Sequence, residues 1–214
     1  MFLITFAVME KKFEELLLRI IPVFMRLGIR SVTMDDIARE LSISKKTIYK
    51  YVKDKPDLVD KAMIWFCKQN QDVVNEITKN SSDAIDEIIG ISKHAGQQLQ
   101  MIHPSVHFDL QKYYPEAWSS FNSYQIDFIR NQIEANLKRG IKEGLYRDNI
   151  NTHIISHLFA AKIDMVFDPE IFPVGKFSFS DVHLEMMRYH IRGIASGKGV
   201  EVLTKKIKNE NFNL

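Results

Sequence analysis

Residues 44–55, SKKTIYKYVKDK, combine side chains whose types and spacing suit a defined chemistry. From Arg39 to Lys55 there are six basic residues and two acidic ones, so this stretch carries +4 while the whole chain carries +2. Lysine ammonium groups neutralise phosphates, and Ser, Thr and Tyr hydroxyls bond phosphate oxygens or base edges. The segment therefore has the chemistry needed to bind duplex DNA.

Two short helices are predicted to position these groups. Thr33 is suited to be the N-cap of the first, and Asp36 completes a capping box with Asp in the place of Glu. Its apolar residues recur at three- and four-residue steps and form one buried face: Met34, Ile37, Ala38 and Leu41.

The second helix is expected over residues 44–52, with Ser44 as its cap. At 100° per residue, Ile48 and Val52 point toward the first helix, while Lys46 and Lys50 point to the opposite side. A short helix of this kind fits the major groove of DNA, and two helices joined by a turn form a helix-turn-helix. The alternative is an ordinary solvated face, because charged helix surfaces and two-helix turns are common.

Composition is that of a water-soluble globular chain with a sizeable core. The 214 residues are 45% hydrophobic and 26% charged, and Cys67 is the single cysteine. A lone thiol among apolar neighbours fits a reducing, cytoplasmic setting and a buried small side chain. The apolar run at residues 1–9 is too short to span a bilayer, so no membrane association is expected. It is interpreted either as a tail or as sequence upstream of a start at Met9.

Helical periodicity dominates and predicts an all-α fold. Beyond the two short helices, Gly28 is expected to end the first long helix, Asp54 to cap the helix from Lys55, and Ser82 to cap the next. The predicted helices cover approximately 11–27, 55–79, 83–101, 104–114, 119–143, 152–167, 180–195 and 201–208. We predict a three-helix helix-turn-helix domain at 10–58 and a helical bundle for ligand binding and dimerisation at 59–214, sharing the helix that starts near Lys55.

The segment TMDDIARELSISKKTIYKYVKDKPDLV, with the preceding FMRLGIRSV, resembles the DNA-binding signature of the tetracycline-repressor (TetR) family. The resemblance is strong over about residues 11–60. The segments GIKEGLYRDNIN and YHIRGIASGKG are similar, more weakly, to recurrent parts of the family's C-terminal domains. Three positions depart from the pattern: Pro22 lies inside a helix, Ser42 replaces the usual turn Gly, and Val52 replaces the usual Phe.

The resemblance implies a role for particular residues. Those expected to line the groove are Ser44, Lys45, Lys46, Thr47, Tyr49 and Lys50. Thr33 and Lys55 are expected to hold phosphates, and Tyr51 either packs or contacts a phosphate. The residues expected to form the core of the motif, away from DNA, are Ile37, Ala38, Leu41 and Ile48.

The resemblance also implies a homodimer formed through the helices at 152–167 and 180–195. There, Ala160 and Ala161 either permit close approach of the two copies or pack only within one copy. An unknown small-molecule effector is expected in the bundle. The aromatic residues of the middle of the chain either line its pocket or form core: Phe108, Tyr113, Tyr114, Trp118, Phe121, Tyr124 and Phe128. The expected function is a regulator, in particular a repressor, that binds a palindromic operator and is released by the effector.

No cofactor, metal or catalytic set is predicted. His103/His107 and His153/His157 have an i, i+4 spacing that can bind metal, but neither pair has an identifiable third ligand. No acid–base pair, nucleophile motif or phosphate loop supports an enzyme. The remaining alternatives are an all-α interaction module or an all-α enzyme that does not bind DNA.

Overall fold

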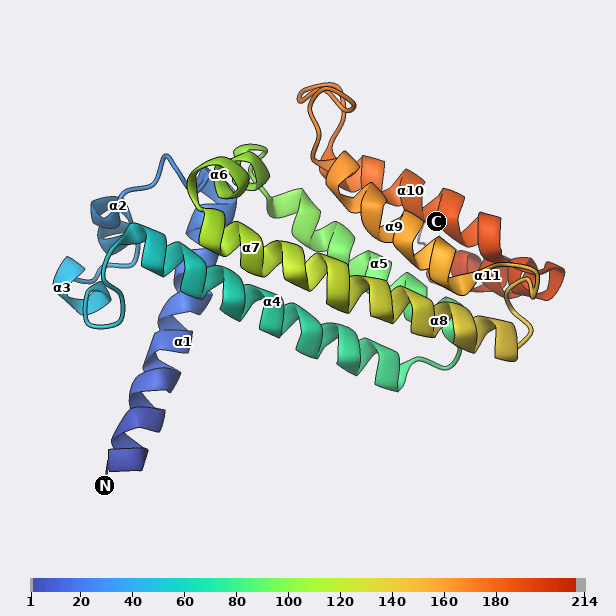
Figure 1. Cartoon of the computed structure of the whole chain (residues 1–214), viewed down its shortest axis with the longest axis horizontal. Coiled ribbons are helices and arrows are strands. Elements are labelled where there is room, and N and C mark those ends of the chain that lie inside the picture. The colour runs from blue at the N-terminus through green and yellow to red at the C-terminus, as the bar shows by residue number, and fades with distance from the viewer. Residues whose placement is uncertain (1, 211–214) are drawn as a thin grey trace. The chain divides into compact units, whose positions relative to one another are not determined.

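The computed structural model describes residues 2–210, and side chains within 10–208 except that of residue 125. In this range every regular element is a helix, which confirms the all-α prediction (Figure 1). The question of a start at Met9 concerns residues 1–9, whose side chains lie outside the described part. The elements are α1 (Phe2–Leu27), α2 (Met34–Glu40), α3 (Lys45–Ile48), α4 (Lys55–Asn80), α5 (Ala84–Met101), α6 (Ser105–Tyr113), α7 (Pro115–Ser123), the π-helical η1 (Tyr124–Ile129), α8 (Arg130–Lys142), α9 (Thr152–Val166), α10 (Phe179–Ile194) and α11 (Gly197–Glu210).

Several details of the helix prediction were wrong, including the starts of the first and last helices, which lie at Phe2 and Gly197 rather than near residues 11 and 201. The helix expected over 44–52 ends at Ile48, and Tyr49 to Tyr51 continue as a turn. The helix expected from Ser119 begins at Pro115 and passes into a π-helical segment before α8, because residue spacing alone does not reveal a π turn. Asp83 rather than Ser82 caps α5, since Asp83 Oδ1 accepts a hydrogen bond from the Asp86 N–H at 2.8 Å.

The first compact unit contains residues up to Asn70 together with Met101–Ser123. Its core is formed by buried apolar side chains from α1 to α4 and by Val106, Leu110 and Tyr114 from α6 and its end. Gly28 follows α1 with φ +82° and donates its N–H to Phe24 O, as expected of a residue that ends a helix. Thus α6 and α7 pack with the N-terminal helices although they follow them by many residues.

The second compact unit contains Gln71–Gln100 and the residues from Tyr124 onward. Its apolar core includes Ile85, Ile88, Leu137, Met187 and Ile191 from α5, α8 and α10. α4 belongs to both units, as predicted for the helix starting at Lys55, with the division after Asn70. The boundary between these units lies after Asn70, whereas the predicted boundary between the DNA-binding and effector-binding domains lies between residues 58 and 59. The latter concerns functional domains and stays a prediction.

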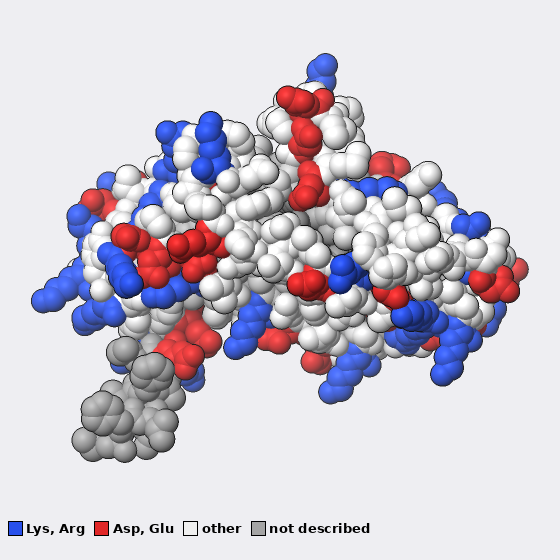
Figure 2. Space-filling model, viewed as in Figure 1, with Lys and Arg blue, Asp and Glu red and all other residues white. Residues whose placement is uncertain are grey.

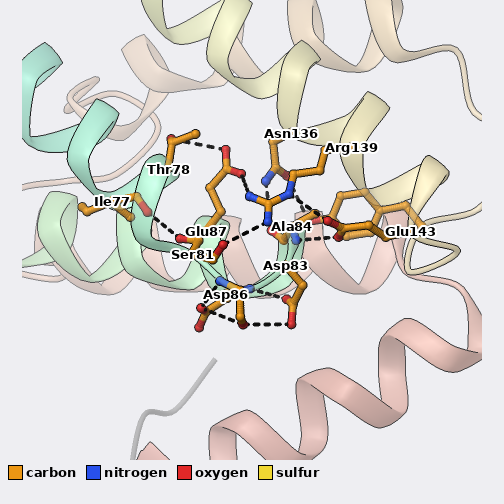
Figure 3. Close-up of polar contacts among 12 residues, drawn as sticks. Ile77, Thr78, Ser81, Asp83, Ala84, Asp86, Glu87, Asn136, Arg139 and Glu143 are labelled. Atoms are coloured by element: carbon orange, nitrogen blue, oxygen red, sulfur yellow. Dashed lines mark hydrogen bonds and ion pairs between the residues drawn. The ribbon is translucent and has the colours of Figure 1, made fainter.

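A partly buried ionic cluster joins the α4–α5 turn to α8 in the second unit (Figure 3). The Arg139 guanidinium donates to Glu87 Oε2 at 2.9 Å, to Glu143 Oε1 at 2.8 Å and to Ser81 O at 3.0 Å. Glu87 is only 2% exposed, and Glu143 also accepts the Ala84 N–H at 2.8 Å. One arginine therefore compensates a buried carboxylate and ties together three segments of the chain.

None of the described helices is both long and apolar enough to span a bilayer.

Candidate nucleic-acid interface

Buried apolar side chains fix the two short helices on the first core. Ile37 in α2 and Ile48 in α3 are fully buried, and Leu41 and Val52 are nearly so. Ala38 is buried too, so the predicted core of the motif is confirmed. A helix as short as α3 is only marginally stable alone. Burial of Ile48 and Val52 supplies the stability that so few helical hydrogen bonds cannot.

Hydrogen bonds at the helix starts follow the predicted caps. The Thr33 hydroxyl accepts the Asp36 N–H at 3.1 Å, and the Asp36 carboxylate accepts the Thr33 N–H at 2.9 Å, which completes the capping box. The side-chain and backbone hydrogen bonds from Thr33 lower the pKa of Asp36. Ser44 accepts the Thr47 N–H at 3.1 Å and starts α3. Both helices therefore begin at fixed positions.

The outward side of α3 and its following turn is cationic, as predicted. Lys46 and Lys50 are exposed, and Tyr49 is 47% exposed beside them. The Ser44 and Thr47 hydroxyls lie 2.9 Å apart, so the two groups are hydrogen-bonded to each other at the start of the helix. This surface offers ammonium and hydroxyl groups to solvent from a well-packed support.

Lys45 is engaged within the protein. Its ammonium lies 2.9 Å from a carboxylate oxygen of Asp35 in α2, and this hydrogen bond raises the pKa of Lys45. Both side chains are exposed, so the ion pair is weak and can exchange for another anion. Lys45 is thus available to a phosphate only in competition with Asp35.

Lys55 and Tyr51 are held by neighbours. The Lys55 ammonium donates to Arg30 O at 3.1 Å and lies over the Tyr114 ring, while partial burial lowers the pKa of Lys55. Tyr51 stacks on Phe13 with ring centroids 5.1 Å apart and is half-buried. Tyr51 therefore has a packing role. Lys55 connects the segment before α2, at Arg30, to the residue that follows α6, Tyr114.

The aromatic residues of the middle of the chain divide between the two units. Tyr114, Trp118 and Phe121 pack in or against the first core, whereas Tyr124 and Phe128 stack on each other at 5.4 Å in the second unit. Phe108 is 52% exposed. These positions favour core packing for most of the group.

The histidine pairs have local contacts. His103 Nδ1 lies 3.0 Å from Ser105 Oγ, and the rings of His153 and His157 touch at a centroid separation of 4.3 Å. Within the described part of the chain, no three His, Cys, Asp or Glu side chains are grouped as metal ligands.

Sequence reasoning missed Arg30 and the surface of α6. Arg30 precedes the first short helix and bonds to Tyr113 and Asp109, which lie about 80 residues further along the chain. The cation at Arg30 was visible in the sequence, but its partners on α6 depend on tertiary packing.

The packed two-helix motif with an outward cationic side defines a helix-turn-helix DNA-binding protein. Residues 21–62 match the family model described as "Bacterial regulatory proteins, tetR family". A Bacillus subtilis protein described as the uncharacterized HTH-type transcriptional regulator YvaF is 27% identical over 143 residues, which cover 65% of this chain and 73% of that protein.

Solved structures agree on the fold. A TetR-family regulator from Agrobacterium tumefaciens superposes with a TM-score of 0.69 at 16% identity, covering 87% of this chain and 99% of that one. FadR from Bacillus subtilis in complex with stearoyl-CoA gives 0.63 at 17% identity, covering 85% and 99%. Residues 21–62 therefore match the DNA-binding domain of TetR-family regulators, and the described chain shares the fold of such regulators.

Proposed function

We propose that this protein is a cytoplasmic repressor that binds a palindromic operator as a homodimer and leaves it when a small-molecule effector binds. The observation that carries the proposal is the exposed cationic strip of Lys46 and Lys50 on a buried support. Ser44, Thr47 and Tyr49 line the major groove beside these lysines, with Lys45 joining after it leaves Asp35. Thr33 and Lys55 hold flanking phosphates.

An apolar stripe on α9 supports the dimer. Ile154, Leu158, Ala161 and Met165 are exposed at helical spacing and share one face of α9. α10 packs beside α9, and its Tyr189 is 75% exposed under the Lys162 ammonium. A contiguous exposed apolar surface of this kind marks an interface, and a second copy doubles the DNA contacts.

Effector binding in the second unit is proposed to act through α4, the helix that both units share. The FadR structure, with its stearoyl-CoA, supports a ligand in this fold. A reoriented α4 changes the separation of the two α3 helices in the dimer, so that they no longer fit successive grooves. A coupling of about 1–3 kcal/mol is typical of such linkage.

Selection of bound sequences from random duplex DNA tests the proposal, with a palindrome as the expected result. On the selected duplex, Lys46→Ala is expected to reduce the slope of log K against log salt by about one per protomer. Lys205→Ala removes an exposed lysine of α11 and is the matched control, with an unchanged slope. A protein that shifts no duplex at low salt supports an interaction module instead.

Leu158→Glu tests the dimer separately. It places a charge in the apolar stripe of α9, so the variant is expected to be monomeric by sedimentation and to bind the operator more weakly. A dimer that persists in this variant contradicts the proposed interface.

A further inference from the structure

Two cations and two aromatic rings form an exposed surface on α6 and the segment before α2, here called the α6 ledge: Phe108, Lys112, Tyr113 and Arg30. The Arg30 guanidinium lies 4.2 Å from the Tyr113 ring centroid and donates to the Tyr113 hydroxyl at 2.5 Å. The Lys112 ammonium lies 5.1 Å from the Phe108 ring centroid and 5.6 Å from that of Tyr113. In Figure 2, Lys and Arg side chains gather over α6 as well as around α2 and α3.

The aromatic rings hold these cations without neutralising them. Cation–π contacts restrict the side chains, which lowers the entropy lost when they bind an anion. Among the described residues, no acidic side chain lies within salt-bridge distance of the Arg30 guanidinium or the Lys112 ammonium. The nearby carboxylate of Asp109 is buried and accepts the Arg30 backbone N–H at 2.9 Å and the Ser105 hydroxyl at 3.1 Å.

The ledge lies in the same compact unit as the proposed DNA surface. Thr33 is three positions after Arg30, so their Cα atoms are at most roughly 11 Å apart. Lys55, which is proposed to hold a phosphate, donates to Arg30 O at 3.1 Å. Arg30, Lys55 and Lys112 thus extend the cationic surface from the short helices onto α6.

We propose that the α6 ledge binds phosphates of the DNA backbone beside the helix-turn-helix, and this inference rests on the proposed DNA-binding function. The planar Arg30 guanidinium keeps donors beyond the one used by Tyr113 and can bond a phosphate in a bidentate manner. Lys112 adds a point charge. Phe108 and Tyr113 orient the cations and do not stack on bases, because the bases of a duplex are already stacked. The ledge therefore contributes affinity without sequence preference.

A salt series with charge-removing variants tests the inference. Arg30→Gln and Lys112→Gln are each expected to reduce the slope of log K against log salt by about one per protomer, and to weaken binding about five-fold per protomer near 0.15 M salt. The loss is expected to be equal on the selected operator and on a scrambled duplex of the same length. Arg30→Lys keeps the charge and is expected to keep the slope.

Lys205→Gln makes the same change of net charge on α11 and is the control for non-local effects. Lys112→Gln alters an exposed side chain, so it tests the ledge even where Arg30→Gln reduces folding, which far-UV circular dichroism checks. Wild-type slopes in both Lys112→Gln and Arg30→Gln, alongside a reduced slope in Lys46→Ala, overturn the ledge and leave the proposed function intact. A wild-type protein that binds no duplex overturns both.

Discussion

Replacing Arg139 with Met tests the partly buried ionic cluster of the second unit. Met keeps most of the apolar stem but removes three hydrogen bonds, to Glu87, Glu143 and Ser81. Because Glu87 is 2% exposed, its carboxylate is left in the interior without a cation. Breaking a fully buried pair costs about 3–5 kcal/mol of unfolding free energy, and the lower end, about 3 kcal/mol, is expected here because Arg139 is 30% exposed.

Urea unfolding followed by far-UV circular dichroism, at one protein concentration, measures this loss. With an m-value of about 3 kcal/mol/M or less, the midpoint of the affected transition is expected to fall by about 1 M or more. Both tryptophans, Trp65 and Trp118, lie in the first unit. Their fluorescence therefore reports that unit, and its transition is expected to shift less than the transition seen by circular dichroism.

Two further variants complete the test. Lys138→Met removes the neighbouring exposed cation of α8, which pairs with Glu134, and is expected to cost less than about 1 kcal/mol. Glu87→Gln added to Arg139→Met is expected to recover part of the loss, because it removes the uncompensated charge. Equal midpoints for Arg139→Met and Lys138→Met, or no recovery in the double variant, refute the reasoning.

Three shorter predictions concern single residues. Ser42 has φ +55°, so Ser42→Gly is expected to raise the unfolding free energy by about 0.5–1 kcal/mol in urea melts, with Ser42→Ala as the control that keeps the strain. Burial lowers the pKa of His190 from 6.5 to about 4. Below pH 6.5 the unfolded chain therefore binds a proton at His190 that the folded protein does not. The free energy of unfolding is expected to fall by up to about 3 kcal/mol as the pH drops from 6.5 toward 4. Melts of His190→Met across this range are expected to show a smaller fall than wild type. Burial raises the pKa of the Cys67 thiol to about 12, so a thiol reagent at pH 8 is expected to label it only after unfolding, and rapid labelling of the native protein contradicts this.

Local sequence signals predicted the helix-turn-helix well. Capping at Thr33 and Ser44 and burial of Ile37 and Ile48 depend on side chains within a few residues, and all four were correctly assigned. The length of α3 was overestimated because apolar spacing at Ile48 and Val52 is also satisfied by a short helix followed by a turn.

Features that depend on distant partners were not predictable. The role of Arg139 arises from its contact with Glu87, which lies 52 residues earlier in the chain. The α6 ledge likewise joins Arg30 to Tyr113 across 83 residues. The predicted DNA contacts rest on residue type and family resemblance. Contacts in the groove also depend on the base sequence of the operator, which the protein sequence does not reveal.

The division of the first core between two stretches of chain has a consequence for biosynthesis. Residues 1–70 leave the ribosome well before residues 101–123, yet Val106, Leu110, Tyr114 and Ala117 complete the same buried cluster. Part of the apolar surface of the nascent N-terminal helices therefore stays exposed until the later residues have been synthesised. Translation adds roughly 5–20 residues per second. The helix-turn-helix reaches its final packing only after more than half of the polypeptide has been translated.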